Sequence, residues 1–239
     1  MKHLTRKLGA AALLALMLLP VAHAEIYTPV DLPLNEMGAN IRNWSGGSVY
    51  NALYPNSSQT LAGVPFQFAS NANGNNVISS GTQIIPVGID DVRTVYTLIN
   101  TAWGSPGALV GSLTFISSDG DSFTANLIEG YNVRDHYYGG YVNTTSSPDT
   151  IDAVWGINAP GYAHLDLQIF SLPESFWEET LDRIVFVSSG GYSGAPFLAA
   201  LTVGTVPVVD SVPEPGTWSL LLGSLALMGG LARRRQSLQ

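Results

Sequence analysis

Short β-prone runs, separated by glycine-, asparagine- and serine-rich stretches, recur along most of this chain and leave few folds open to it. No amphipathic helix of convincing length interrupts them, although residues 175–181 have room for one or two helical turns. Runs of this length and spacing predict an all-β domain, a β-sandwich or jelly roll, over residues 25–204. The runs cover residues 63–68, 83–87, 95–101, 109–117, 122–128, 151–155, 165–170, 184–188 and 197–203.

Three details predict the place of individual strands. Asp119-Gly120 lies between two β-prone runs, and this dipeptide favours the tight turn of a hairpin. Pro86 has no backbone N–H to donate, which favours a sheet edge or a strand end for residues 83–87. The apolar run at 184–188 predicts a buried strand.

Charge and cysteine content exclude several classes of function. All 18 acidic residues lie between Glu25 and Glu214, a span with four arginines and no lysine, so its net charge is −14. Such a body repels phosphate backbones and anionic lipid heads, which excludes nucleic acid as a partner. The chain has no cysteine, which excludes disulfides, thiolate metal sites and a cysteine nucleophile.

The first 24 residues have the pattern of a secretory signal peptide. Three basic residues precede an apolar stretch at 8–21, and the small residues Ala22 and Ala24 flank His23 before Glu25. A basic region, a short apolar region and a small-x-small site predict cleavage after Ala24. We therefore expect export through the Sec translocon.

The last 28 residues, 212–239, form a second organised segment after a linker at 205–211. Pro213-Glu214-Pro215 is followed by an apolar stretch at 218–232 and by Arg233-Arg234-Arg235. This stretch is at the short end for a bilayer span, and its cationic end should stay cytoplasmic. The pattern predicts a short transmembrane helix that holds the body outside.

This order of motif, apolar helix and arginine cluster resembles the PEP-CTERM sorting signal. The resemblance implies a Gram-negative bacterium that makes exopolysaccharide, with recognition and cleavage by an exosortase near Pro-Glu-Pro. It also implies a transient stay in the inner membrane and then release to the cell surface or extracellular matrix. The alternative interpretation is a plain single-span anchor, and neither says what the body does.

The order of segments in the body resembles a galactose-binding-like β-sandwich over about residues 60–203. The family implies the sandwich fold and, in many members, sugar binding, whereas others are purely structural. The segments that carry the resemblance are 61–66, 75–78, 85–88, 95–103, 115–120 and 198–203.

A glycine-bounded segment at 130–141 holds four tyrosines together with Arg134, Asp135 and His136. Sugar rings stack on aromatic planes while charged groups pair with their hydroxyls, and loops on a rigid scaffold often carry function. The alternative is that these aromatics pack over the sandwich end. The candidate ligand-binding residues are Trp103, Tyr131, Arg134, Asp135, His136, Tyr137, Tyr138 and Trp155.

Reactive groups for catalysis are poorly placed. Residues 191–195 approximate a nucleophile elbow around Ser193, but no histidine follows His164. Glu174, Glu178 and Glu179 cluster near Trp177, and nothing in their spacing places two carboxylates across a scissile bond. We therefore expect a non-catalytic body.

Metal ligation is weakly indicated as well. His136 and His164 lack ligand spacing, and Asp119 and Asp121 are the calcium candidates, although the hairpin turn is the favoured interpretation. We predict no cofactor beyond such a structural calcium ion. The leading hypothesis is an exported surface or matrix sandwich that contacts exopolysaccharide. The alternatives are a structural or adhesive matrix protein acting through protein contacts, and a secreted glycan hydrolase.

Overall fold

A computed structural model describes residues 24–34, 38–54, 57–191 and 194–206. The contacts of the chain divide after Val206, and the described residues all belong to the unit that ends there. Ala24 is exposed and lies outside any strand. The rest of the predicted signal peptide, the sorting segment and Ser193 fall outside the described residues.

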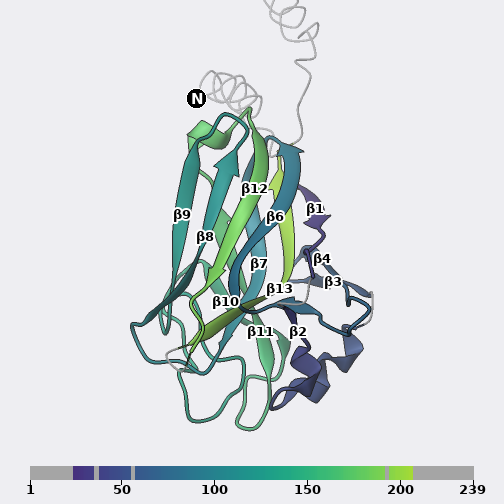
Figure 1. Ribbon diagram of the computed structural model, residues 1–239, viewed down its shortest axis with the longest axis vertical. Coiled ribbons are helices and arrows are strands. Elements are labelled where there is room, and N and C mark those ends of the chain that lie inside the picture. The colour runs from purple at the N-terminus through teal and green to yellow at the C-terminus, as the bar shows by residue number, and fades with distance from the viewer. Residues whose placement is uncertain (1–23, 35–37, 55–56, 192–193, 207–239) are drawn as a thin grey trace, which may run out of the picture. The chain divides into compact units, whose positions relative to one another are not determined.

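Two antiparallel sheets form the body. Figure 1 shows the strands of the smaller sheet side by side, and each of its neighbouring pairs is antiparallel. Its order is β6 (Gly81–Asp90), β12 (Thr180–Ser188), β8 (Leu109–Ser117) and β9 (Ser122–Ile128). The larger sheet runs β10 (Thr150–Gly156), β11 (His164–Ser171), β7 (Val92–Ala102), β13 (Ala195–Thr205), β5 (Val77–Ile78) and β2 (Gly38–Ala39), and β1 (Ile26–Val30) also pairs with β13.

The main core lies between these two sheets. Along β8 and β12, buried and less buried positions alternate, as expected for strands with one face toward a core. Phe115 and Phe186 from the smaller sheet pack with Ile99 and Leu198 from the larger one. The body is therefore a β-sandwich.

A second core covers the outer face of the larger sheet. The hairpin of β3 (Ser57–Leu61) and β4 (Val64–Phe68) packs there, together with the 3₁₀ helices η2 (Ile41–Asn43) and η3 (Gly47–Ala52). Because both faces of the sheet are covered, β7 and β13 are buried almost along their whole length. The continuous apolar run of β13 is the pattern expected of a strand with no solvent-facing side.

The sequence prediction of an all-β sandwich is confirmed. Eight of the nine predicted runs lie within a strand, and the ninth, 63–68, begins one residue before β4; the turn at 118–121 joins β8 to β9 with Gly120 at a φ of 94°. Pro86 lies in β6, at the edge of the smaller sheet. The strands β1, β2, β3 and β5 and the 3₁₀ helices η2 and η3 were not predicted from the sequence. The narrower galactose-binding-like resemblance stays a prediction.

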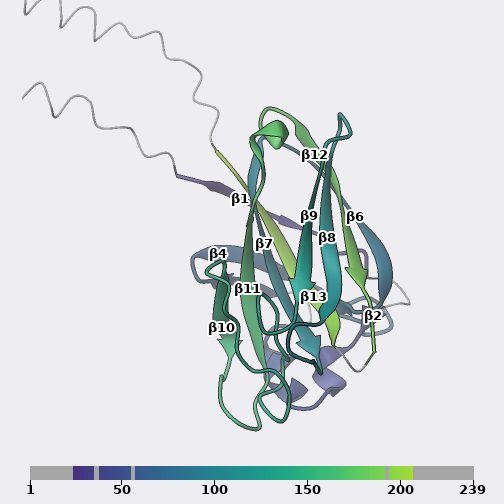
Figure 2. The same ribbon diagram turned by 90° about the vertical axis from the view of Figure 1, so that its left-hand side faces the viewer.

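The two ends of the sandwich carry different elements. Figures 1 and 2 both place η2 and η3 at one end, and the β8–β9 turn with the 3₁₀ helix η4 (Glu174–Phe176) at the other. β7 has eleven residues and runs between them, so the ends are roughly 30 Å apart. Within the part of the chain that the structure describes, no helix has the length and apolar character needed to cross a membrane.

Candidate functional site

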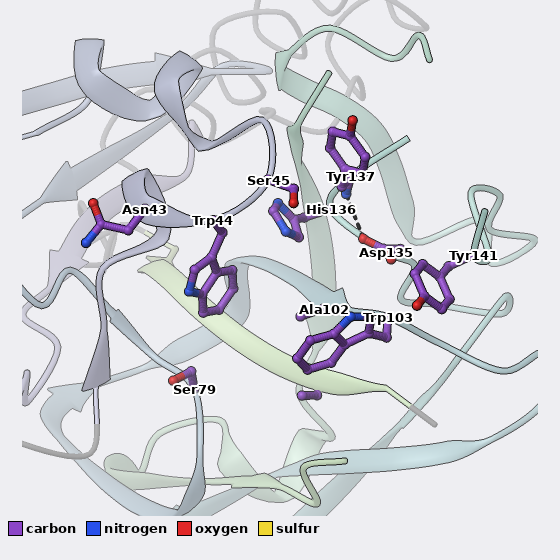
Figure 3. A pocket seen from close by; sticks show the side chains of 11 residues that line it. Asn43, Trp44, Ser45, Ser79, Ala102, Trp103, Asp135, His136, Tyr137 and Tyr141 are labelled. Atoms are coloured by element: carbon purple, nitrogen blue, oxygen red, sulfur yellow. Dashed lines mark hydrogen bonds between the residues drawn. The ribbon is translucent and has the colours of Figure 1, made fainter. Parts of the chain in front are cut away.

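An aromatic cleft of about 480 Å³ opens at the end of the sandwich where β7 finishes. Figure 3 shows the rings of Trp44, Trp103, Tyr137 and Tyr141 arranged around Asp135 and His136. Five separate segments contribute: the η2–η3 junction, the β5–β6 connection, the end of β7, the loop after β9 and the start of β13. The lining residues are Asn43, Trp44, Ser45, Ser79, Ala102, Trp103, Asp135, His136, Tyr137, Tyr141 and Ala195.

The η2–η3 junction places Trp44 on the cleft wall. The Asn40 side chain accepts a hydrogen bond from the Arg42 N–H at 3.1 Å, which caps η2. The chain then turns so tightly that a Cβ on Gly47 would lie 2.1 Å from the Ile41 carbonyl oxygen, so only glycine fits. As a result the Trp44 ring packs edge-on against His136 and Phe197, with centroids 5.4 and 5.2 Å away.

Trp103 follows β7 in a strained conformation. Its φ of 63° lies in the left-handed region that bulky residues rarely adopt, and its side chain is 41% exposed. The Thr101 hydroxyl lies 2.8 Å from the Trp103 carbonyl oxygen and holds this turn against the end of the strand. A large aromatic side chain that is both strained and exposed is a mark of a functional position.

Asp135 belongs to a segment that runs alongside the end of β7. The Thr101 N–H donates to the Arg134 carbonyl at 2.9 Å, and the His136 N–H donates to the Thr101 carbonyl at 2.8 Å. Asp135 Oδ1 accepts the Tyr137 N–H at 2.7 Å, the dashed line in Figure 3. Burial raises the pKa of Asp135 to about 6, against the opposing hydrogen bonds from the backbone of Tyr137 and Trp103. At pH 7 the carboxyl group is therefore ionised in most molecules.

The His136 ring is neutral, and its Nε2 is free to accept a hydrogen bond. The Tyr50 hydroxyl has one proton and lies 2.9 Å from the His164 carbonyl oxygen, which can only accept. His136 Nδ1, 3.1 Å from the same hydroxyl, must then carry the ring proton and donate it, which leaves the lone pair on Nε2. Burial lowers the pKa of His136 to about 3, so the ring carries no charge near neutral pH.

Arg134 lies behind the cleft and not on it. It is 1% exposed, and its guanidinium pairs with Asp166 through Nε–Oδ2 at 2.7 Å and Nη2–Oδ1 at 2.8 Å. Asp166 also accepts from the Asn100 side chain at 2.6 Å, and Arg134 Nη1 donates to the Asn143 carbonyl at 2.7 Å. This two-pronged ion pair fixes the loop after β9 to the larger sheet.

Four of the eight predicted ligand-binding residues come together on the cleft: Trp103, Asp135, His136 and Tyr137. The structure places the others elsewhere. Tyr131 is exposed beside a separate depression of about 280 Å³, the Tyr138 N–H donates to the Tyr162 carbonyl, and Trp155 packs against the second core.

Sequence reasoning missed Trp44, Tyr141 and the small polar residues beside them. Tyr141 closes the tyrosine-rich segment 130–141 and was within reach of the same argument. Trp44 has a weaker signal, because it is a tryptophan within a stretch rich in asparagine, serine and glycine at 40–48. Its distance of 59 positions from Trp103 conceals that the two share a site.

The acidic residues near η4 lie at the far end of the sandwich. The Leu172 N–H donates to the Arg93 carbonyl at 2.8 Å, which ties this segment to the first residues of β7. Glu174 and its neighbours Glu178 and Glu179 are thus roughly 30 Å from the cleft. Asp119 and Asp121 flank the β8–β9 turn at that same end. Among the described residues, no three histidine or carboxylate side chains gather closely enough to hold a metal ion.

Fold and cleft together define a class: an all-β body, a sandwich with an added outer layer, whose loops build an aromatic site at one end. Residues 211–236 match the PEP-CTERM protein-sorting motif. The match includes Pro213, Glu214, Pro215 and the cluster Arg233, Arg234 and Arg235. The chain is therefore one that is exported and sorted by an exosortase to the surface. No curated protein sequence matches the chain.

Proposed function

We propose that the body is a non-catalytic carbohydrate-binding domain, displayed on the surface or in the extracellular matrix, and that its ligand is an exopolysaccharide. The observation that carries this proposal is the aromatic cleft. Trp103 and Tyr141 leave 41% and 49% of their side chains exposed beside the buried carboxylate of Asp135. Tyr131, Tyr162 and Trp177 are exposed as well, but they do not line this cleft.

The chemistry of the cleft suits a sugar. Pyranose rings present C–H faces that stack on aromatic planes, and their hydroxyls need both acceptors and donors. Asp135 and the lone pair on His136 Nε2 supply acceptors, and Ser45 and Asn43 carry polar groups on the same lining. The volume of about 480 Å³ falls in the range of sites for small ligands.

A binding role is favoured over hydrolysis by the count of carboxylates. Glycosidases flank the scissile bond with two carboxyl groups. Of the described residues that line the cleft, Asp135 alone carries one. Glu174, the other acid we considered, lies at the far end of β7.

The route to the surface completes the proposal. We place the protein in a Gram-negative bacterium, with passage through the Sec translocon and a transient stay in the inner membrane through residues 218–232. An exosortase then cuts near Pro213-Glu214-Pro215. The apolar stretch followed by three arginines supports this order of events.

A glycan array tests the binding role. Both cores lie within residues 24–206 and the chain's contacts divide after Val206, so residues 25–211 can be used as a folded unit. The array should include the host's own matrix polysaccharide. We expect binding that Trp103→Ala and Tyr141→Ala each weaken about tenfold or more, because each removes a stacking face.

Tyr162→Ala is the matched control, since Tyr162 is 45% exposed but does not line the cleft. Absence of binding by the folded body would refute the proposal in favour of a matrix protein acting through protein contacts. Release of reducing ends, lost on Glu174→Gln or Ser193→Ala, would instead identify a hydrolase.

A further inference from the structure

The charge on the aromatic cleft restricts which class of sugar it can bind. Asp135 is its one ionised group among the described residues, because His136 stays neutral and no arginine lines the site. The body has no lysine, and its arginines are engaged elsewhere. Arg134 pairs with Asp166, Arg183 with Asp182, Arg93 covers the ring of Trp177 at 4.1 Å, and Arg42 Nε donates to Asn40 at 3.1 Å.

An anionic sugar would therefore enter without a counter-charge. A uronate carboxylate would lose its hydration beside Asp135 and within a body, residues 25–206, of net charge −12. The loss of hydration and the repulsion between like charges both oppose binding. Uronic acid polymers and phosphorylated or sulfated glycans are the wrong chemistry for this cleft.

A cationic sugar finds the opposite environment. The faces of Trp44, Trp103, Tyr137 and Tyr141 attract an ammonium group through their ring quadrupoles. Asp135 adds a full negative charge at the same place, and its position is fixed by the Tyr137 N–H. A carboxylate has acceptor sites to spare beyond the hydrogen bonds from the backbone of Tyr137 and Trp103.

We propose that the aromatic cleft selects hexosamine residues that carry a free, protonated amine, held by an ion pair with Asp135 and by the surrounding aromatic faces. This inference rests on the proposed carbohydrate-binding function and specifies its ligand. The N-acetylated form of the same sugar lacks the charge and has one N–H donor in place of the three of an ammonium group.

Calorimetric titration of residues 25–211 with four tetrasaccharides at pH 7 tests the inference. The probes are β-1,4-linked glucosamine, N-acetylglucosamine, glucose and α-1,4-linked galacturonate. We expect the glucosamine oligomer to bind about tenfold or more tightly than its N-acetylated counterpart, and galacturonate not to bind. The glucosamine affinity should fall as salt rises from about 0.05 M to about 0.3 M.

Asp135→Asn should remove the preference for the amine, so that the ratio of the glucosamine affinity to the glucose affinity falls towards one. Asp119→Asn is the charge-matched control, because it removes one negative charge from the exposed turn at the far end and Asn-Gly serves the same hairpin. It should leave the preference intact.

A second measurement keeps the test decisive if Asp135→Asn fails to fold. In the unaltered body, glucosamine binding should weaken as pH falls from about 6 to about 4.5, because Asp135, with a pKa of about 6, takes up a proton while the sugar amine stays protonated. Of the groups around it, Glu129 has a pKa of about 8 and His136 one of about 3, Arg134 stays paired with Asp166, and burial lowers the pKa of His164.

The outcomes distinguish the preference for an amine from the carbohydrate-binding role itself. Equal affinity for the amine and neutral oligomers, or tight galacturonate binding, would overturn the amine preference and leave the carbohydrate-binding role standing. No binding of any oligomer or of the host polysaccharide by the folded body would overturn both.

Discussion

Thr101 has one hydroxyl proton and two oxygen neighbours. The Trp103 carbonyl oxygen at 2.8 Å can only accept, so the Thr101 hydroxyl donates its proton to that oxygen. Glu129 Oε1, 3.0 Å from the same hydroxyl, must then be the donor of the second hydrogen bond. Glu129 therefore holds a proton, which fits its 1% exposure and the rise of its pKa to about 8 through burial. Gly104 gives this acid its room, since a Cβ there would lie 2.1 Å from Glu129 Oε1. The protonated acid thus supports the strained turn that presents Trp103.

This proton predicts how stability changes with pH. With a pKa of about 8, Glu129 keeps most of its proton in the folded body between pH 6.5 and 7.5, whereas the unfolded chain has released it above about 4.5. Through Glu129 alone, stability should therefore fall as pH rises in this window, by about 1.4 kcal/mol per unit. Unfolded His136 and His164 release protons around pH 6.5 and folded Asp135 does so around pH 6, so the share of Glu129 is the difference in slope from Glu129→Gln. Urea unfolding at both pH values measures the slope.

Glu129→Gln should flatten that slope, because the amide can donate to Thr101 and does not titrate. Asp119→Asn, at the exposed turn, should keep the slope of the unaltered body. An equal slope in the glutamine variant would show that another group is responsible.

Strain at Trp103 predicts that two substitutions there differ in folding stability although both weaken binding. Trp103→Gly should unfold with a free energy about 1 kcal/mol higher than Trp103→Ala, because glycine adopts a φ of 63° without a Cβ conflict. Both variants should lose the aromatic face and bind the glucosamine oligomer more weakly. Chemical unfolding and titration of the pair check this, and equal stability would mean that the turn is not strained.

The site could be predicted in part at this scale. Asp135, His136 and Tyr137 are close in sequence, and their mixture of charge and aromatics indicated a ligand. Arg134 shares that pattern but is captured by Asp166, 32 positions later on another strand. Sequence alone cannot reveal such a partner. The local pattern therefore did not show that Asp166 already neutralises the charge of Arg134.

At the scale of elements, the strands with long β-prone runs were predictable and the outer layer was not. β8, β9 and their Asp-Gly turn are specified by local sequence, so their bounds agree with the prediction. η2, η3 and the two-residue strands depend on distant partners instead. The Asn76 side chain accepts the Ile41 N–H at 3.0 Å across 35 positions and donates to Asn40 at 3.0 Å. No local pattern encodes those contacts.

Asn76 therefore predicts a coupling between the outer layer and the cleft. Asn76→Ala should lower the free energy of unfolding by about 1–3 kcal/mol, because it leaves the buried Ile41 N–H without its acceptor. It should also weaken ligand binding, since Ile41 begins the η2 helix that leads to Trp44. Thermal melting and titration measure both effects. Asn73→Ala, on the exposed turn nearby, is the control, and an unchanged melting temperature in Asn76→Ala would contradict the role.

On the scale of the whole molecule, the sorting motif and the body have separate tasks. The motif at 211–236 directs the chain to the surface, and the described body ends at Val206. Replacing Pro213, Glu214 and Pro215 by alanine should leave the chain in the membrane fraction as the longer, uncut form, because the exosortase reads this motif. Fractionation with an antibody against the body checks this, and unchanged surface delivery would mean that the motif is not needed. The replaced residues lie outside the sandwich, so sugar binding by the purified body should not change.

The pairing of β1 with β13 has a consequence for the timing of folding. Ile26 lies opposite Thr205, so the first strand of the body pairs with the last, and β13 also supplies the middle of the larger sheet. A chain that is threaded outward from its N-terminus cannot close this sheet until almost all of the body has emerged. Contacts between such distant segments form late in any case. For a chain exported in that direction, we therefore expect the larger sheet to close only after β13, the last strand of the body, has emerged.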